Sequence, residues 1–149
     1  MLLSQKCQYA LRASFHLAKH YGQGPVRIAD VAEAQAIPKR FLEVILGELK
    51  QGGFVVSQRG NEGGYALDRD PSGLTVGEII RFVEGPIGPV GCMAGDSREN
   101  CPLRGKCVFM PMWEKVRDQV ENVYDSTTLQ DLVEQERAQQ GELVLDYAI

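Results

Sequence analysis

The stretch from residue 27 to residue 67 constrains the fold of this chain more than any other part of its sequence. It opens with "RIADVAEAQA", whose apolar side chains recur at helical spacing and predict a short helix over residues 27–36. Ile37 and Pro38 interrupt that pattern, and proline is well tolerated as the first residue of a new helix. A second helix, "PKRFLEVILGELKQ", therefore follows within four residues, and two glycines end it.

The helix that begins near Pro38 has clearly divided faces. We expect its inner face to bury the apolar residues Phe41, Leu42, Ile45 and Leu49. Its outward positions carry Lys39, Arg40, Glu43 and Lys50. A helix of this kind packs one side on a core and presents charge on the other.

A β-hairpin is predicted directly after this helix. Residues 54–58 and 65–67 are the strand candidates, and "RGNEGG" between them is a glycine-rich turn that begins with Arg59. Glycines at the tip permit unusual backbone angles and leave the arginine without a bulky neighbour.

With a first helix expected over residues 4–21, the order is helix, helix–turn–helix, hairpin. This is the order of a winged helix-turn-helix domain, mostly α with a small β-hairpin, and we expect residues 1–84 to form one. In such domains the third helix lies in the major groove of double-stranded DNA, and the hairpin reaches the flanking backbone or minor groove.

The predicted DNA contacts divide by their chemistry. Lys39 and Arg40 open the third helix, where they meet phosphates or base edges. Glu43 can accept a hydrogen bond from cytosine N4, and the alternatives are that it repels an ill-fitting site or is a solvated surface acid. Arg59 is the candidate for the minor groove. Two further residues are expected to contact phosphates, Arg27 and Gln58.

The second half of the chain begins with another helix. Thr75 and Glu78 have the spacing of a capping box, and Gly85 ends the helix. Further on, apolar residues recur at steps of four, three, four and three, at Phe109, Trp113, Val116, Val120 and Val123. This narrow stripe is typical of two helices that pair, so we predict a dimerisation helix that packs on its copy in a second subunit. The alternative is that the stripe packs inside the monomer.

The dimerisation helix and a short capped helix after it are assigned to residues 109–136. We expect the short helix, "DSTTLQDLVEQERAQQ", to be anchored by Leu129, Leu132 and Val133. Residues 137–149 are expected to be a tail, loose from about Gly141.

Three of the four cysteines, Cys92, Cys101 and Cys107, lie in a glycine-rich, charged loop predicted over residues 85–108. The N-terminus does not resemble a secretory signal and no apolar run is long enough to cross a bilayer, so we expect a cytoplasmic protein with reduced thiols. Thiolates are the usual ligands of iron–sulfur clusters. Three cations in the loop can offset the charge of such a centre, namely Arg98, Arg104 and Lys106.

Zinc is disfavoured in this loop, because structural zinc sites usually contain a pair of ligands two to four residues apart. Zinc stays open as an alternative, and three metal-free thiols are another. The fourth cysteine, Cys7, has helical spacing with Leu11 and Ala18, so we expect it in the core. His16 and His20 are likewise expected to be satisfied helix residues and not ligands.

The net charge of −4 is distributed unequally along the chain, with a basic first half and an acidic second half, which indicates two parts with different roles. Residues 1–69 carry nine Lys/Arg and six Asp/Glu, whereas residues 70–149 carry seven and fourteen. The basic half is the one with the predicted DNA contacts. Sequence motifs of phosphate-binding loops, serine hydrolases and zinc proteases are absent from the chain, and we predict that it is not an enzyme.

Over residues 1–135 the sequence resembles the IscR/NsrR/CymR-type family of bacterial winged helix-turn-helix transcription regulators, in particular its iron–sulfur-cluster-binding branch. The carrying stretches are "YALRASFHLA", residues 27–67 with "RGNEGGYAL", "LTVGEIIRFVEGP", the three-cysteine loop and "DSTTLQDL". The resemblance implies a homodimeric repressor that reads a pseudo-palindromic operator. In the sensing members the three cysteines hold a cluster that responds to redox state, nitric oxide or iron supply.

Other members of this family lack the cluster. A cluster-free regulator, controlled by a partner protein or by thiol oxidation, therefore stays open as the alternative.

The sequence departs from the family pattern at the fourth ligand. Members with a 2Fe–2S centre have a histidine three residues after the last cysteine, and Met110 stands there in this chain. Other members draw a ligand from the first helix near the position of Gln8, a poor iron ligand. An open fourth position suits a 4Fe–4S cluster, which we favour slightly over 2Fe–2S.

Overall fold

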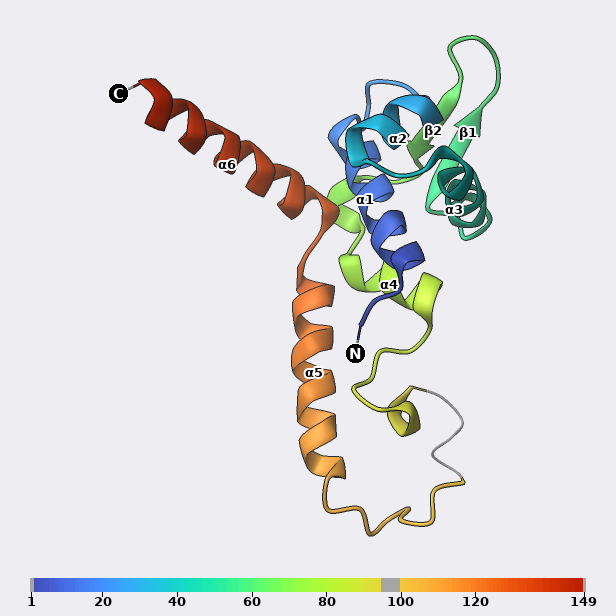
Figure 1. The fold of residues 1–149 in the computed structure, drawn as a ribbon, viewed down its shortest axis with the longest axis vertical. Helices are drawn as coiled ribbons and strands as arrows, with labels where there is room; N and C mark the ends of the chain where they lie inside the picture. Colours follow the sequence, from blue (N-terminus) through green and yellow to red (C-terminus); the bar gives the residue numbers. More distant parts are fainter. Residues whose placement is uncertain (1, 95–99, 149) are drawn as a thin grey trace.

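The computed structural model describes residues 2–94 and 100–148 and has a helical head from which two long helices extend (Figure 1). The α-helices are α1 (Gln5–Lys19), α2 (Ile28–Gln35), α3 (Lys39–Gln51), α4 (Val76–Glu84), α5 (Met110–Ser126) and α6 (Leu129–Ala148). The strands β1 (Val55–Gln58) and β2 (Gly64–Leu67) form an antiparallel hairpin, and short 3-10 turns lie at η1 (Pro71–Gly73) and η2 (Gly91–Met93). The expected winged helix-turn-helix arrangement is confirmed.

The core of the head forms around α1, which contacts α2, α3, α4 and α6. Leu17 of α1 is fully buried with Leu42, Leu46 and Leu49 of α3 and Ile79 of α4. Burying each such side chain contributes about 1.5–3 kcal/mol relative to leaving it in water. These contacts make the helix–turn–helix a rigid platform for the residues on its outer face.

Phe41 does not belong to that core. The prediction that it is buried was wrong, because 46% of its surface is exposed while Leu42, Ile45 and Leu49 are buried as expected. Helical spacing defines a stripe but not its edges, and Phe41 lies at the edge where α3 faces solvent.

The wing is fixed to the head by a backbone bridge. Val26, just before α2, exchanges two N–H···O bonds of 2.8 Å with Tyr65 of β2. Gly64 makes this possible, since a Cβ there would collide with the Val26 carbonyl oxygen. This isolated bridge ties the segment before α2 to the hairpin.

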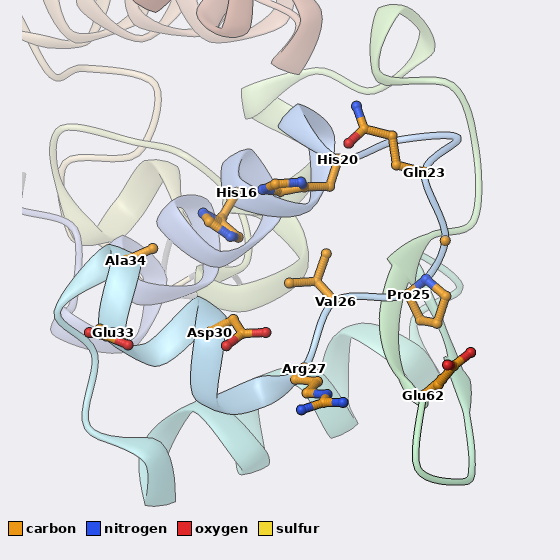
Figure 2. Close-up of a pocket in the computed structure, with 11 residues that line it drawn as sticks. His16, His20, Gln23, Pro25, Val26, Arg27, Asp30, Glu33, Ala34 and Glu62 are labelled. Atoms are coloured by element: carbon orange, nitrogen blue, oxygen red, sulfur yellow. The ribbon is translucent and has the colours of Figure 1, made fainter.

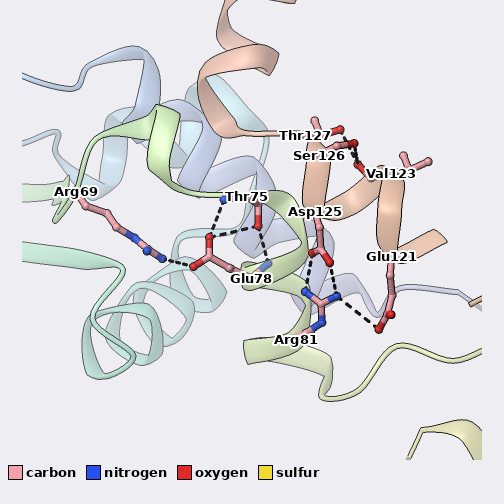
Figure 3. Close-up of polar contacts among 9 residues, drawn as sticks. All are labelled: Arg69, Thr75, Glu78, Arg81, Glu121, Val123, Asp125, Ser126 and Thr127. Atoms are coloured by element: carbon pink, nitrogen blue, oxygen red, sulfur yellow. Dashed lines mark hydrogen bonds and ion pairs between the residues drawn. The ribbon is translucent and has the colours of Figure 1, made fainter. Parts of the chain in front are cut away.

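The helix α4 begins with the predicted capping box. The backbone N–H of Thr75 donates to the Glu78 carboxylate at 2.9 Å, and the Glu78 N–H donates to the Thr75 hydroxyl at 3.3 Å (Figure 3). Arg69 also pairs with Glu78, at 2.8 Å. These contacts fix the point at which the chain leaves the wing.

The apolar stripe on α5 is largely uncovered in the single chain. Val120 and Tyr124 pack against a small cluster of Cys7, Ile80 and Ile87, so packing inside the monomer holds for this part of the stripe. Exposure is 58% at Phe109, 36% at Val116 and 59% at Val123.

The C-terminal region corrects a prediction. Leu129 and Val133 are buried and Leu132 packs on the head, as expected, but α6 continues to Ala148 where a loose tail was predicted. Gly141 does not adopt a left-handed conformation that would stop the helix. Of all helices in the described ranges, none combines the length and apolar character that crossing a membrane requires.

Candidate nucleic-acid interface and cysteine cavity

The outward face of α3 carries the predicted contact residues. Lys39, Arg40 and Glu43 are all exposed in its first two turns. The Arg40 guanidinium lies 4.7 Å from the ring centre of Phe41, a cation–π contact that restricts the arginine. At the other end of α3, the Lys50 ammonium donates to the Ser57 hydroxyl at 2.5 Å, which links the helix to β1.

The wing presents Arg59 at its tip and Gln58 at the end of β1, both exposed. Arg27 is also exposed, and its Nη2 donates to the Asn61 carbonyl oxygen at 3.1 Å. Arg27 therefore supports the hairpin tip from the start of α2, a role that its position in the sequence did not indicate. The predicted contact residues thus lie on three adjacent elements: the start of α2, the outer face of α3 and the hairpin.

The three loop cysteines line one cavity of about 500 Å3, the cysteine cavity. All three are partly buried and unpaired thiols. Cys107 lies one turn before α5, where its carbonyl oxygen accepts from the Met110 N–H at 3.3 Å. The remaining lining residues are Leu103, Arg104, Gly105, Met110 and Pro111. Of the loop cations considered above, Arg98 lies outside the described residues.

The side chains that line this cavity and could ligate a metal are sulfur donors, three cysteines and one methionine. Among the residues that the structure describes, no three His, Cys, Asp or Glu side chains gather tightly enough to ligate a single metal ion. The three cysteines line one cavity together with Arg104, whose charge can offset that of thiolates. Soft thiolate donors arranged around a cavity are chemically suited to an iron–sulfur cluster.

Neither Gln8 nor its neighbour Cys7 on α1 lines this cavity. Cys7 is fully buried, as expected, and burial together with the adjacent Glu84 carboxylate raises the pKa of its thiol to about 11. Gln8 is exposed and donates from Nε2 to the Leu3 carbonyl oxygen at 3.1 Å. The core role predicted for Cys7 is confirmed.

A second cavity, of about 780 Å3, lies between the end of α1, α2 and the wing, and the sequence did not indicate it (Figure 2). His16 and His20 line it with ring centres 4.8 Å apart, facing Asp30 and Glu33 of α2. His16 is buried, and its Nδ1 lies 3.5 Å from Nε2 of Gln35. Burial, followed by the charges of His20 and Lys19, lowers the pKa of His16.

Residues 3–135 match the family model of Rrf2, described as an iron-dependent transcriptional regulator. The chain belongs to the Rrf2 family. The match covers the winged helix, the cysteine loop, all of α5 and the first part of α6. As the resemblance implied, this Rrf2 protein is a transcriptional regulator of the helix–turn–helix type and not an enzyme.

Two kinds of curated Rrf2 relatives are similar to this chain. The regulator CymR of Bacillus subtilis is 37% identical over 132 residues, 89% of each chain. The regulator IscR of Photorhabdus laumondii is 34% identical over 133 residues, 89% of this chain and 79% of its own.

Solved structures give the same picture of the Rrf2 fold. CymR, described as the global cysteine regulator of B. subtilis, superimposes with a TM-score of 0.74 at 35% identity and covers 90% of this chain and 97% of its own. The IscR of T. potens gives 0.73 at 36% identity and covers 91% and 88%. Since both kinds of relative match about equally well, the choice between cluster control and thiol control rests on this chain's own residues.

Proposed function

We propose that this Rrf2 protein is a homodimeric, cytoplasmic repressor whose affinity for a pseudo-palindromic DNA operator is set by an iron–sulfur cluster. Cys92, Cys101 and Cys107 are the proposed ligands. The observation that carries the proposal is that these three thiols line one cavity directly before α5.

Each subunit would bind DNA through the exposed residues of α3 and the wing. Lys39 and Arg40 supply positive charge at the start of α3, and Arg59 supplies it at the hairpin tip. Phosphate contacts of this kind fix the register, whereas Glu43 is positioned for a base edge. The spacing between two such heads fixes which operators fit.

The uncovered stripe on α5 supports the dimer. Phe109, Val116 and Val123 expose apolar surface at coiled-coil spacing, and a second copy of the same helix would cover it. The Rrf2 family description is consistent with control by iron. When bound, a cluster supplies a centre that oxidants, nitric oxide or iron starvation can alter.

The chain's own contacts provide a route from cavity to head. Cys107 precedes α5 by a single turn, and the other end of α5 pairs with Arg81 of α4 (Figure 3). Reordering of the loop would therefore act on the orientation of α5 relative to the head.

The test is anaerobic purification followed by iron and sulfide counts, and then by operator affinity with and without the cluster. The probe is a duplex selected from a random pool by the wild-type protein. We expect visible absorbance and at least about a tenfold difference in affinity between the two forms, within the usual range of allosteric coupling. Equal affinities would contradict control by the cluster.

Variants separate ligands from structural cysteines. Cys101→Ser should lose iron without loss of fold, because Cys101 is a partly exposed loop residue. Cys7→Ala is the matched control: it should keep iron and lower the melting temperature, since Cys7 is fully buried.

A cluster-free regulator controlled by thiol oxidation is the second candidate. It is favoured by the similarity to CymR and by the partial exposure of all three loop thiols. Colourless anaerobic protein without iron, together with an operator affinity that falls on peroxide treatment and recovers with dithiothreitol, would support this candidate instead.

A further inference from the structure

One stripe on the outward face of α3, beside Glu43, carries no charge after Arg40. Arg40, Val44 and Gly47 follow one another at steps of four and three, so they lie on one stripe of the helix. Charged or polar residues flank this stripe at both ends, with Lys39 at the start and Lys50 and Gln51 at the end. A valine and a glycine are unexpected at the centre of a solvent-facing surface.

Val44 is exposed to 59% and faces away from the head core. On one side it borders an apolar groove of about 350 Å3 with Tyr9, Phe41 and Ile45. Packing within the head therefore does not account for its methyl groups, which remain available for an apolar contact with another molecule.

Gly47 is not required by the fold. A Cβ at this position meets nothing within 4 Å among the described atoms outside its own helix turn, and its backbone is not left-handed. Glycine is among the least favourable residues in a helix interior. A glycine at position 47 is explained if another molecule approaches the α3 backbone closely at this point.

We propose that Val44 and Gly47 form a contact strip for thymine: Val44 packs on the C5-methyl group of a thymine in the major groove, and Gly47 lets the α3 backbone approach the base edges. This inference rests on the proposed binding of DNA by α3. The C5-methyl of thymine is the apolar group that the major groove displays. The flanking cations would hold the helix on the phosphates while the strip contributes specificity.

The test of Val44 replaces thymine by deoxyuridine, one position at a time, in the duplex selected by the wild-type protein. This substitution removes a single methyl group. At one thymine per half-site we expect the affinity of the wild type to fall about fourfold, as for exposing one buried methyl or methylene group. Val44→Ala should bind the thymine and deoxyuridine duplexes equally well. A wild type that tolerates deoxyuridine at every position overturns the role of Val44.

The test of Gly47 measures both stability and operator affinity, which Gly47→Ala should change in opposite directions. Gly47→Ala should raise the melting temperature, because alanine favours the helix and meets no steric conflict. It should also weaken operator binding about tenfold, comparable with one mismatched base pair. Gly141→Ala is the matched control: Gly141 is a second helical glycine with open space, so stability should rise while operator affinity stays unchanged.

Unchanged operator affinity of Gly47→Ala overturns the role of Gly47. If the wild type selects no duplex at all, the proposed DNA-binding function itself fails, and this inference fails with it. If the wild type selects a duplex but tolerates deoxyuridine and Gly47→Ala, only the thymine strip is overturned. If a protein partner binds in the apolar groove and the Val44 and Gly47 variants bind DNA like the wild type, the strip is also overturned.

Discussion

Arg81 of α4 holds Asp125, close to the end of α5, through both ends of its guanidinium group. The Nη1–Oδ1 distance is 2.6 Å and the Nη2–Oδ2 distance is 2.8 Å (Figure 3). Glu121, one turn earlier on α5, lies 3.5 Å from the same arginine. Gly77 leaves room for this pair, since a Cβ there would collide with Oδ1 of Asp125. The pair fastens α5 to the head.

We predict that Asp125→Asn lowers the free energy of unfolding by about 1 kcal/mol at pH 7, the upper end for a partly exposed ion pair. The hydrogen bonds from Arg81 hold the pKa of the Asp125 carboxyl below its usual 3.8. A lowered pKa gives stability that is complete above the unfolded value and is lost as the pH falls through the folded one. The difference in the free energy of unfolding between wild type and Asp125→Asn, measured by urea unfolding, should therefore be constant from pH 7 to 5. It should shrink below pH 4.

The control for this pair is a double-mutant cycle. In an Arg81→Met background, Asp125→Asn should have little further effect, because its partner is already gone. If Asp125→Asn lowers the free energy of unfolding equally in the Arg81→Met background, the ion pair is not the cause of the loss of stability.

We predict that Gly64→Ala destabilises the head by about 2 kcal/mol, as is typical when a backbone contact is forced apart. A methyl group at this position collides with the Val26 carbonyl oxygen and breaks the Val26–Tyr65 bridge. Gly73→Ala is the matched control, since a Cβ at Gly73 has open space. Thermal unfolding of both variants checks the prediction, and equal melting temperatures would contradict it.

We predict that Arg59→Ala leaves stability unchanged and weakens operator binding, with altered preference at the flanking A·T pairs. Arg59 is exposed, whereas Arg27 donates to the Asn61 carbonyl oxygen at the wing tip. Arg27→Ala should therefore weaken binding through a less ordered wing, with no shift of base preference. Affinity measured on duplexes with and without A·T flanks distinguishes the two variants. Unchanged affinity of Arg59→Ala would reject the wing contact.

We predict that the stability of the head falls as the pH drops below about 6.5, and that His16 causes the fall. Its burial lowers the pKa of the imidazole below 6.5, so the unfolded chain binds more protons in this range. The slope contributed by one such group does not exceed about 1.4 kcal/mol per pH unit. His16→Gln should remove most of the slope in urea titrations between pH 7 and 5, and a slope that persists in this variant would contradict the role of His16.

Local sequence patterns predicted the head well because its elements are set by local signals. The capping box at Thr75, the proline before α3 and the glycines of the hairpin each act within a few residues. Cys7 was assigned to the core by its helical spacing, and it is fully buried there.

The misplaced residues depend on contacts between distant segments. Burial of Phe41 depends on how far α1 reaches over α3, which the period of one helix does not contain. The bracing role of Arg27 depends on the wing tip folding back toward α2. The glycine at position 141 predicted the start of a loose tail, yet helix-favouring residues on both sides continue α6 to Ala148.

The attachment of α5 has a mechanical consequence. The helix is about 25 Å long at 1.5 Å per residue, and it is held near Asp125 while its N-terminal end projects from the head (Figure 1). Such an element is a lever with a long arm on the cysteine side and its fulcrum at Arg81. If the cysteine loop changes its conformation, the displacement at the far end of α5 would turn the helix about its attachment to α4.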